Sequence, residues 1–536
     1  MSKKLEVQES HVSEPPSLSD LEKSESKNPF ADEKVATYYR QMYEDVKYEC
    51  RGSFDPSFQW TAEEEKKVVR KLNFRVAFAA CLMFVALQVD RGNLQQAVSD
   101  NLLDDLGLTT DDYNMGNTIF YLSFLLAEIP SQMISKALGP DIFIPIQICA
   151  WSVVALSQVA LSGKVSFYIT RCLIGAIEGG FIADLVLWLS YFFTSKELPI
   201  RLSWFWTTLT LTQIFAALAA FAILRLRGVF GWPGWAHLFF WEGLFTLAIG
   251  IASFYLMVPS AVQTKNWMHP KGWFSEREEK IVVNRILRDD PTKGSMHNRQ
   301  AIGLKQLWTC LIDYDLWPLY SIGVMAYIGN FTFGSYFTLM TRQLGFGVFD
   351  TNLLTIPQAV LYILNLLAIT WLSERFQNRS MISLISPIYC FIVLGVIRFY
   401  PGSGIEIWPS YVMNTIYMGQ PFIHAILVSW VSRNSNSVRT RSICSAVYNM
   451  FVQTGAIIAQ NMFRADDAPL YKRGLLQLWC IALAVVPILL LTKFYYIWRN
   501  KSREKIWSAM TEIEKDEYRR TTTDDGNKRL DFRFTH

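Results

Sequence analysis

The chain has 536 residues, of which 51% are hydrophobic and 14% aromatic, while only 18% are charged. The charged share lies well below the roughly 25% of soluble globular proteins. The formal net charge of +4 is too small to indicate a nucleic-acid partner, and the basic residues flank apolar runs instead of forming one patch. This composition excludes an ordinary soluble domain and favours a membrane protein with polar ends.

The first 73 residues are polar and contain no apolar core of the kind that a cleaved signal peptide needs. We therefore expect residues 1–73 to form a cytosolic N-terminal segment, with the first apolar run acting as its own insertion signal. Within this segment Thr61 is followed by Glu64, which is the spacing of a capping box. The spacing predicts a helix that begins there and runs into the first span.

Windows of about 20 apolar residues predict membrane-spanning helices, and the chain contains twelve of them in two sets of six. Residues 74–258 hold the first set, near 75–97, 114–135, 141–161, 167–192, 203–225 and 238–258. Residues 316–497 hold the second set, near 316–338, 352–372, 381–400, 406–430, 441–462 and 476–497. The predicted fold class is an all-α membrane protein built from two six-helix halves.

The polar segments between and after the two sets are expected in the cytosol, because basic residues gather at these ends of the spans. Residues 259–315 form the one long polar connection. Ser275 and Glu278 again have capping-box spacing, and Val282 and Ile286 repeat at a helical interval. A short amphipathic helix lying on the cytosolic face is predicted here. Residues 498–536 are predicted to form a cytosolic tail.

Two six-helix halves joined by a long loop are typical of secondary transporters, whose substrate site lies between the halves near the membrane midplane. The sequence contains no G-x-x-x-x-G-K-[ST] loop, which disfavours an ATP-driven pump. It contains no recognisable convergence of nucleophile and base and no metal-ligand spacing. We therefore expect neither an enzyme nor a bound metal or cofactor.

Several motifs occur in an order that is known from one family. They are "ALQVDRGNL", "AEIPSQMISKALGPD", "RCLIGAIEGGF", "WEGLFT", "SERFQNRS" and "RADDAPLYKRGL". The chain resembles the anion:cation symporter family of the major facilitator superfamily, in the fungal allantoate-permease type. The stretch "LRDDPTKGSMHNRQ" is similar to a narrower branch associated with alternative sulfur sources such as sulfonates. The resemblance implies uptake of a small organic anion by proton symport.

The chain departs from the family pattern at two places that matter for its predictions. The family commonly has proline where Ala183 stands, so we expect the fourth span to be straighter at its cytosolic end. Related carriers of multiply charged anions have a basic residue in the seventh span, where this chain reads "YIGNFTFGSYF". A substrate with one negative charge is therefore expected, with Asn330 among the polar residues that would contact it.

Ionisable residues inside apolar runs are the main site candidates, because a charge in the bilayer persists mainly where it faces a cavity or a partner. Arg171 and Glu178 lie seven residues apart and share one helix face. Arg91 and Arg171 are predicted to bind the substrate anion, since a guanidinium can hold a carboxylate or sulfonate with two hydrogen bonds. Glu178 is the predicted proton site, with Asp90 as a second one. The alternative is that these residues form purely structural ion pairs.

His424 is the one histidine well inside a predicted span; packing is its favoured role and substrate contact the alternative. Aromatic residues, including Tyr121, Trp206, Tyr327, Phe331 and Tyr336, either line the site or pack. Six further residues are predicted to serve gating or structure: Glu128, Asp184, Glu242, Gly175, Gly179 and Gly180.

The expected partners are a small anionic substrate, a proton and the lipid bilayer, with no nucleic acid, and the chain is expected to be a monomer. The plasma membrane is the predicted location, with the endoplasmic reticulum or the vacuolar membrane as alternatives. A monocarboxylate vitamin or an amino-acid derivative is the alternative substrate. A non-transporting nutrient sensor is the alternative of another class, although such sensors usually add a longer cytosolic tail than this one.

Overall fold

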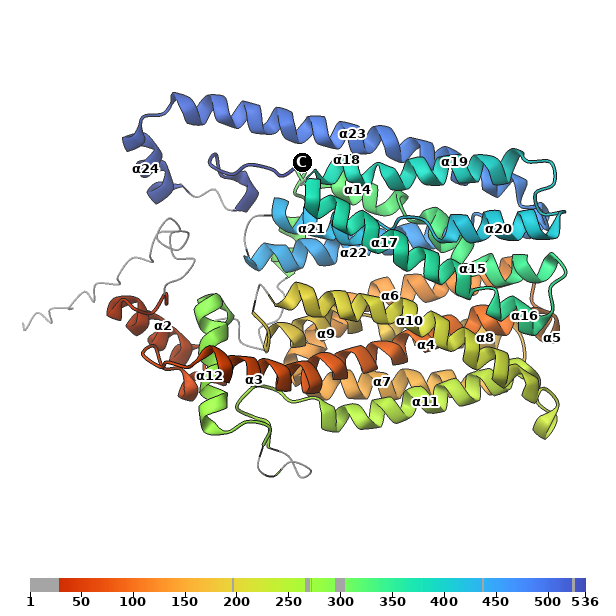
Figure 1. Ribbon diagram of the computed structural model, residues 1–536, viewed down its shortest axis with the longest axis horizontal. Coiled ribbons are helices and arrows are strands. Elements are labelled where there is room, and N and C mark those ends of the chain that lie inside the picture. Colours follow the sequence, from red (N-terminus) through yellow and green to blue (C-terminus); the bar gives the residue numbers. More distant parts are fainter. Residues whose placement is uncertain are drawn as a thin grey trace, which may run out of the picture.

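A computed structural model of the protein describes residues 28–194, 197–265, 270, 272–294, 304–376, 378–435, 438–522 and 526–536. These residues form two helical bundles that pack side by side, the N-half and the C-half (Figure 1). We call one end of the bundles the terminal side, because α2 (Glu33–Asp45), α12 (Glu276–Asp289) and α24 (Glu512–Thr521) lie there. The opposite end, with α5 (Leu102–Leu106) and α16 (Val348–Leu353), is the loop side.

The N-half contains the first six predicted spans. Its helices are α4 (Phe78–Ser99), α6 (Thr110–Leu138), α7 (Pro140–Ser157), α8 (Lys164–Glu178), α9 (Phe181–Ser190), α10 (Leu198–Ile223) and α11 (Gly234–Leu256). Before them, α3 (Ala62–Leu72) continues into α4 through a π-helical turn, Asn73–Ala77, without a break. The capping box of Thr61 and Glu64 begins α3, as predicted.

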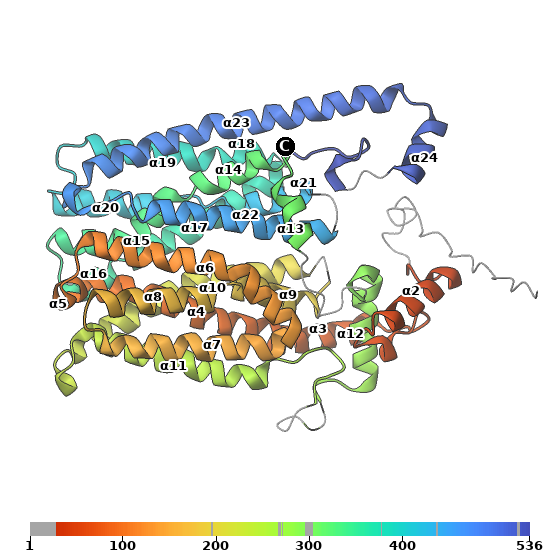
Figure 2. The ribbon, with the colours of Figure 1, turned by 180° about the vertical axis from the view of Figure 1, so that it is seen from behind.

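The C-half contains the other six. Its helices are α14 (Trp317–Met325), α15 (Ile328–Gln343), α17 (Ile356–Phe376), α18 (Arg379–Ser383), α19 (Ile385–Phe399), α20 (Ile407–Met418), α21 (His424–Asn434), α22 (Val438–Ala459) and α23 (Lys472–Ala509). On the terminal side α13 (Leu304–Leu311) packs against α22. Where the halves meet, α4, α6 and α10 face α15, α22 and α17 (Figure 2).

Within the residues that the structure describes, eight helical stretches are long and apolar enough to cross a membrane. Of the other predicted spans, two correspond to α6, which begins with acidic residues, and to α22. The remaining two are interrupted: the seventh breaks between α14 and α15, and the tenth between α20 and α21. The predicted all-α fold class is confirmed and the twelve predicted spans are consistent with it, whereas the breaks were not predicted.

The fourth span is interrupted upstream of Ala183, and the helix is continuous at its predicted cytosolic end, where a straighter course is expected. This span breaks at Gly179 and Gly180, which separate α8 from α9, while Ala183 lies within α9. Gly180 has φ of +82°, a left-handed conformation that glycine adopts at no steric penalty. The glycine pair therefore interrupts the helix before position 183, where related proteins commonly have proline. The interruption does not need a proline.

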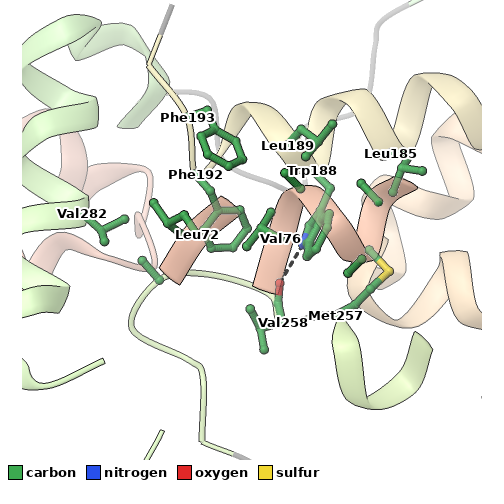
Figure 3. Close-up of a cluster of buried hydrophobic side chains, with 14 of the residues drawn as sticks. Leu72, Val76, Leu185, Trp188, Leu189, Phe192, Phe193, Met257, Val258 and Val282 are labelled. Atoms are coloured by element: carbon green, nitrogen blue, oxygen red, sulfur yellow. Dashed lines mark hydrogen bonds between the residues drawn. The ribbon is translucent and has the colours of Figure 1, made fainter. Parts of the chain in front are cut away.

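The predicted helix of the central connection is α12, and its capping box of Ser275 and Glu278 is confirmed. It is not a one-sided surface helix, however, because residues 281–287 are all buried. Val282 contacts a cluster on the terminal side of the N-half that includes Leu72, Phe192 and Phe193 (Figure 3). In the same cluster the indole of Trp188 donates to the carbonyl of Val258 at 2.9 Å. The apolar positions of α12 thus bury protein surface instead of facing lipid.

Polar contacts also tie α12 to the N-half. Arg285 donates to the Glu197 carboxylate at 2.6 Å and to the carbonyl of Phe192 at 3.1 Å. Burial acts to raise the pKa of Glu197, but the hydrogen bond and charge of Arg285 outweigh it and leave that pKa lowered. Tyr43 of α2 donates to the carbonyl of Pro291. Of the predicted segments 1–73 and 259–315, residues 1–27, 266–269, 271 and 295–303 lie outside the described residues.

Candidate substrate site between the two halves

An ion pair between α4 and α8 lies at the centre of the candidate site. The Nε of Arg91 donates to Oε2 of Glu178 at 2.8 Å. The Glu178 side chain is 0% exposed and that of Arg91 is 23% exposed. Glu178 is the last residue of α8, directly before the glycine break. The sequence predicts that Arg171 and Glu178 share one face of the same helix. The side chain that pairs directly with Glu178 is instead Arg91, from a different helix.

Arg171 is buried two turns earlier on α8. Its Nη2 donates to Oδ1 of Asn117 at a long 3.4 Å, while its Nε has no hydrogen-bond partner within the described ranges. The guanidinium carbon lies 4.5 Å from the centroid of the Phe120 ring, and that of Arg91 lies 5.9 Å from the same ring. Among the described residues Arg171 forms no direct ion pair with a carboxylate. The Glu178 carboxylate lies within electrostatic reach, and the direct contacts of the guanidinium are an aromatic face and an amide.

The side chain of Asp90 has a different partner from that of its neighbour Arg91. The indole of Trp151 on α7 donates to Oδ2 of Asp90 at 3.0 Å, inside the N-half. Glu242 of α11 is also buried and lies within electrostatic reach of Asp90. In the described part of the chain neither of its carboxylate oxygens has a hydrogen-bond partner. The two acidic residues form a buried group behind the Arg91–Glu178 pair, and this pairing of α4 with α11 was not predicted.

Three glycines bring α8 close to α6. A Cβ on Gly175 would overlap the backbone carbonyl of Phe120, and one on Gly179 would lie 2.9 Å from the carbonyl of Phe124. A Cβ on Gly180 would lie 2.8 Å from the hydroxyl of Ser131. This close packing carries Arg171 against Phe120. The remaining predicted gating residues, Glu128 of α6 and Asp184 of α9, are both buried.

The C-half faces this site with aromatic residues. His424 is the first residue of α21, directly after the interruption at 419–423. Its ring lies 6.2 Å from that of Trp206 on α10 and 5.5 Å from that of Tyr327. Asn330 is half-buried on α15. Its neighbour Phe331 contacts Tyr121 at 6.1 Å, next to Phe120. The contacts of His424 that the structure describes are aromatic, which fits its predicted packing role and leaves substrate contact a proposal.

On the loop side of the site the halves are joined by hydrogen bonds. Tyr113 donates to the carbonyl of Ser335 at 3.0 Å, and the Asn114 amide donates to the carbonyl of Phe463 at 2.6 Å. The Tyr336 hydroxyl donates to the side-chain oxygen of Asn114. Two further bonds join Thr338 to Gln95 and Asn352 to Ser99. The loop side is thus closed by contacts between the halves.

Sequence reasoning missed the partners that shape the site: Asn117, Phe120, Trp151, Tyr113 and Asn114. A signal for two of them was present, because Asn114 and Asn117 are amides at the start of a predicted span. A buried amide needs hydrogen-bond partners and therefore marks a helix contact.

Comparison with known proteins decides the family. The model of the Major Facilitator Superfamily matches residues 78–460. The chain belongs to this superfamily. It is 43% identical over 527 residues to an uncharacterized transporter of Saccharomyces cerevisiae, YIL166C, covering 97% of this chain and 96% of that one. It is also 25% identical over 483 residues to the major facilitator-type transporter hxnP of Emericella nidulans, covering 88% and 93%.

Solved structures of the superfamily share the fold. A bacterial homologue of the human lysosomal transporter Spinster aligns with a TM-score of 0.56 at 13% identity, covering 78% of this chain and 96% of that one. The xylose transporter XylE of E. coli aligns with a TM-score of 0.57 at 13% identity, with the same coverage. The chain is therefore a multi-pass membrane transporter of the major facilitator fold and not an enzyme.

Proposed function

We propose that this transporter imports a small organic anion together with a proton by alternating access. The observation that carries the proposal is the buried guanidinium of Arg171, which lacks a carboxylate partner among the described residues and lies beside the Arg91–Glu178 pair. Arg91 and Arg171 both lie beside Phe120, and Glu178 forms an ion pair with only one of them among the described residues. A buried charge is expensive unless it is paired, so an anionic substrate is the natural partner.

The Arg91–Glu178 pair supplies a means of coupling. Protonation of Glu178 removes its negative charge and releases Arg91 from the ion pair. Both guanidinium groups can then hold one carboxylate or sulfonate. Conversely, an anion on Arg91 and Arg171 weakens their hold on the Glu178 carboxylate and favours its proton. Proton and anion therefore promote each other's binding, which is the thermodynamic requirement for symport.

Alternating access is supported by the asymmetry of the contacts between the halves. Hydrogen bonds close the loop side, and the basic residues at the ends of the spans favour a cytosolic terminal side. In this orientation the described state is closed toward the outside. Rocking of the two halves about the site would break the loop-side bonds and expose Arg171 to external substrate.

The finer assignment rests on the resemblance to the allantoate-permease type. It favours a sulfonate or another sulfur compound, or an allantoate-like ureido acid, carried across the plasma membrane by a monomer. A monocarboxylate vitamin or an amino-acid derivative satisfies the same two arginines. Since no basic residue accompanies Asn330 in the seventh span, we propose a monoanion. For a monoanionic substrate, a simple alkyl sulfonate should compete with uptake, whereas sulfate should not.

The test is uptake into proteoliposomes with and without an imposed pH gradient. Glu178→Gln mimics the protonated acid permanently, so it is expected to abolish accumulation driven by the gradient while preserving exchange of internal for external substrate. Glu63→Gln is the matched control, because Glu63 is exposed on α3. Accumulation against a gradient by Glu178→Gln would place the proton site elsewhere. Absence of any transport by the native chain would favour a sensor.

A further inference from the structure

Residues 526–536 return to the terminal side of the C-half and bind there. Phe534 is 2% exposed. Its ring stacks on that of Tyr496 with 4.9 Å between centroids, and the guanidinium carbon of Arg503 lies 4.6 Å from its centroid. Both partners belong to α23. Phe534 therefore occupies a pocket with one aromatic wall and one cationic wall, the arrangement of a specific anchor.

Side-chain amides bind the backbone on either side of this anchor. The Asn500 amide donates to the carbonyl of Phe534 at 2.8 Å and accepts from its N–H at 2.8 Å. Asn434 accepts from the N–H of Thr535 at 2.9 Å, and the Trp430 indole donates to the carbonyl of Thr535 at 2.7 Å. Asn500 lies on α23, whereas Asn434 and Trp430 lie on α21. The segment thus bridges two helices through paired backbone bonds.

A charged contact adds a third helix. The Lys528 ammonium lies 2.6 Å from the Asp313 carboxylate and 2.7 Å from that of Asp315, directly before α14. The Asp315 side chain is 0% exposed. Burial acts to raise the pKa of Asp315, but Lys528, Tyr495 and Arg499 outweigh it and leave that pKa lowered. Asp315 therefore remains a charged anchor for the segment.

The helix bound by this segment also carries a candidate site residue. In α21, Trp430 and Asn434 lie toward one end, and His424 is the first residue at the other. An 11-residue helix is about 16 Å long, so one continuous helix connects the strap contacts to His424. Before it, residues 419–423 interrupt the helical path from α20. Helix ends at such interruptions absorb the backbone changes of hinge motions.

We propose that residues 526–536 act as a strap that clamps α21 to α23 and thereby sets the position of His424 at the substrate site. Release of the strap frees α21 to turn about residues 419–423. The strap itself is independent of the transported substrate. Only the final step, an effect on affinity through His424, rests on the proposed function. A modification or partner that displaces Phe534 would then regulate transport.

The strap is tested by peptide binding. A chain that stops after Asp525 is purified, and a fluorescent peptide of residues 526–536 is titrated onto it. We expect saturable binding that weakens at least about tenfold when the peptide carries Phe534→Ala, because a buried aromatic anchor dominates such contacts. The matched control is His536→Ala, an exposed residue two positions away, which is expected to bind like the native peptide. No binding, or equal binding by the Phe534→Ala peptide, would overturn the strap.

The effect on α21 is tested without substrate and then with it. Hydrogen exchange of residues 424–434 should accelerate in the shortened chain and in Phe534→Ala, while α19 stays unchanged and added peptide restores protection. Unchanged exchange in α21 would overturn the clamp.

The link to His424 is tested in uptake assays. Phe534→Ala should change KM at least about threefold, whereas His536→Ala should leave KM unchanged. An unchanged KM alongside faster exchange would overturn the link to His424. A native chain that transports no anion would refute the proposed function, while the binding and exchange results still decide the strap.

Discussion

At the scale of single residues, the site is defined by how unequally its two arginines are compensated. Arg91 has a carboxylate at 2.8 Å, whereas Arg171 has an amide at 3.4 Å and an aromatic face. Both groups adjoin the same Phe120 ring. An arriving anion therefore gains most from Arg171, and Arg91 becomes available when Glu178 is neutral.

Replacing Arg171 with Lys tests this division of roles. The ammonium keeps the charge but loses the planar fork and the stacking on Phe120. We expect uptake at low substrate concentration to fall by at least about tenfold, while the protein still reaches the membrane. Substrate affinity measured in vesicles is the readout. An unchanged affinity would leave Arg171 with a structural role only.

At the scale of elements, the contact of α8 with α6 positions these charges. The backbone of α6 reaches Gly175 so closely that no side chain fits between them. The break at Gly179 and Gly180 then turns the chain, and the Gln147 amide donates to the Gly179 carbonyl at 2.9 Å. This bond satisfies a carbonyl that the helix end leaves free.

Gly175→Ala is expected to destabilise the protein by about 1–3 kcal/mol, because a backbone carbonyl cannot yield to an added methyl group without moving the helix. Gly92→Ala is the matched control, since a Cβ there meets nothing within 4 Å. Thermal unfolding in detergent should show a lower midpoint for Gly175→Ala alone, with reduced uptake. Equal midpoints would show that α8 shifts freely on α6.

The sequence predicted the elements better than their contacts. Apolar windows located the spans, and two capping boxes marked the starts of α3 and α12, because both signals are local. The glycine break and the choice of Arg91 as partner of Glu178 escaped prediction. They depend on how α4, α6 and α8 are rotated against each other, and one sequence does not reveal helix rotation. The buried face of α12 was missed for the same reason, since lipid and protein select similar apolar residues.

At the scale of the whole molecule, hydrogen bonds join the two halves on the loop side. Two of them meet at Asn114, whose side-chain amide donates to the carbonyl of Phe463 and accepts from the hydroxyl of Tyr336. Both are C-half residues packed against each other, with 5.3 Å between ring centroids. In the alternating-access mechanism proposed above, we expect this small network to favour the state that is closed on the loop side.

Asn114→Ala should shift the population toward a state open on the loop side. Loss of a buried hydrogen-bond partner costs about 1–3 kcal/mol, and this penalty disappears once the site is hydrated. Spin labels at the exposed positions Phe230 and Ile405, one in each half, should report longer distances. Asn378→Ala, which removes a helix cap within the C-half, is the control. Identical distance distributions in the two variants would exclude this role for Asn114.

Each described segment on the terminal side attaches to one of the two halves, which indicates where the chain can be cut. The helices α2, α3 and α12 bind to the N-half, while α13 and residues 526–536 bind to the C-half. A cut within residues 295–303 would leave every described helix whole and each attachment with its own half. Coexpressed fragments 1–294 and 304–536 are therefore expected to reassemble in the membrane, recognised by copurification and by uptake. Each half would then be a module that can be exchanged separately between related carriers.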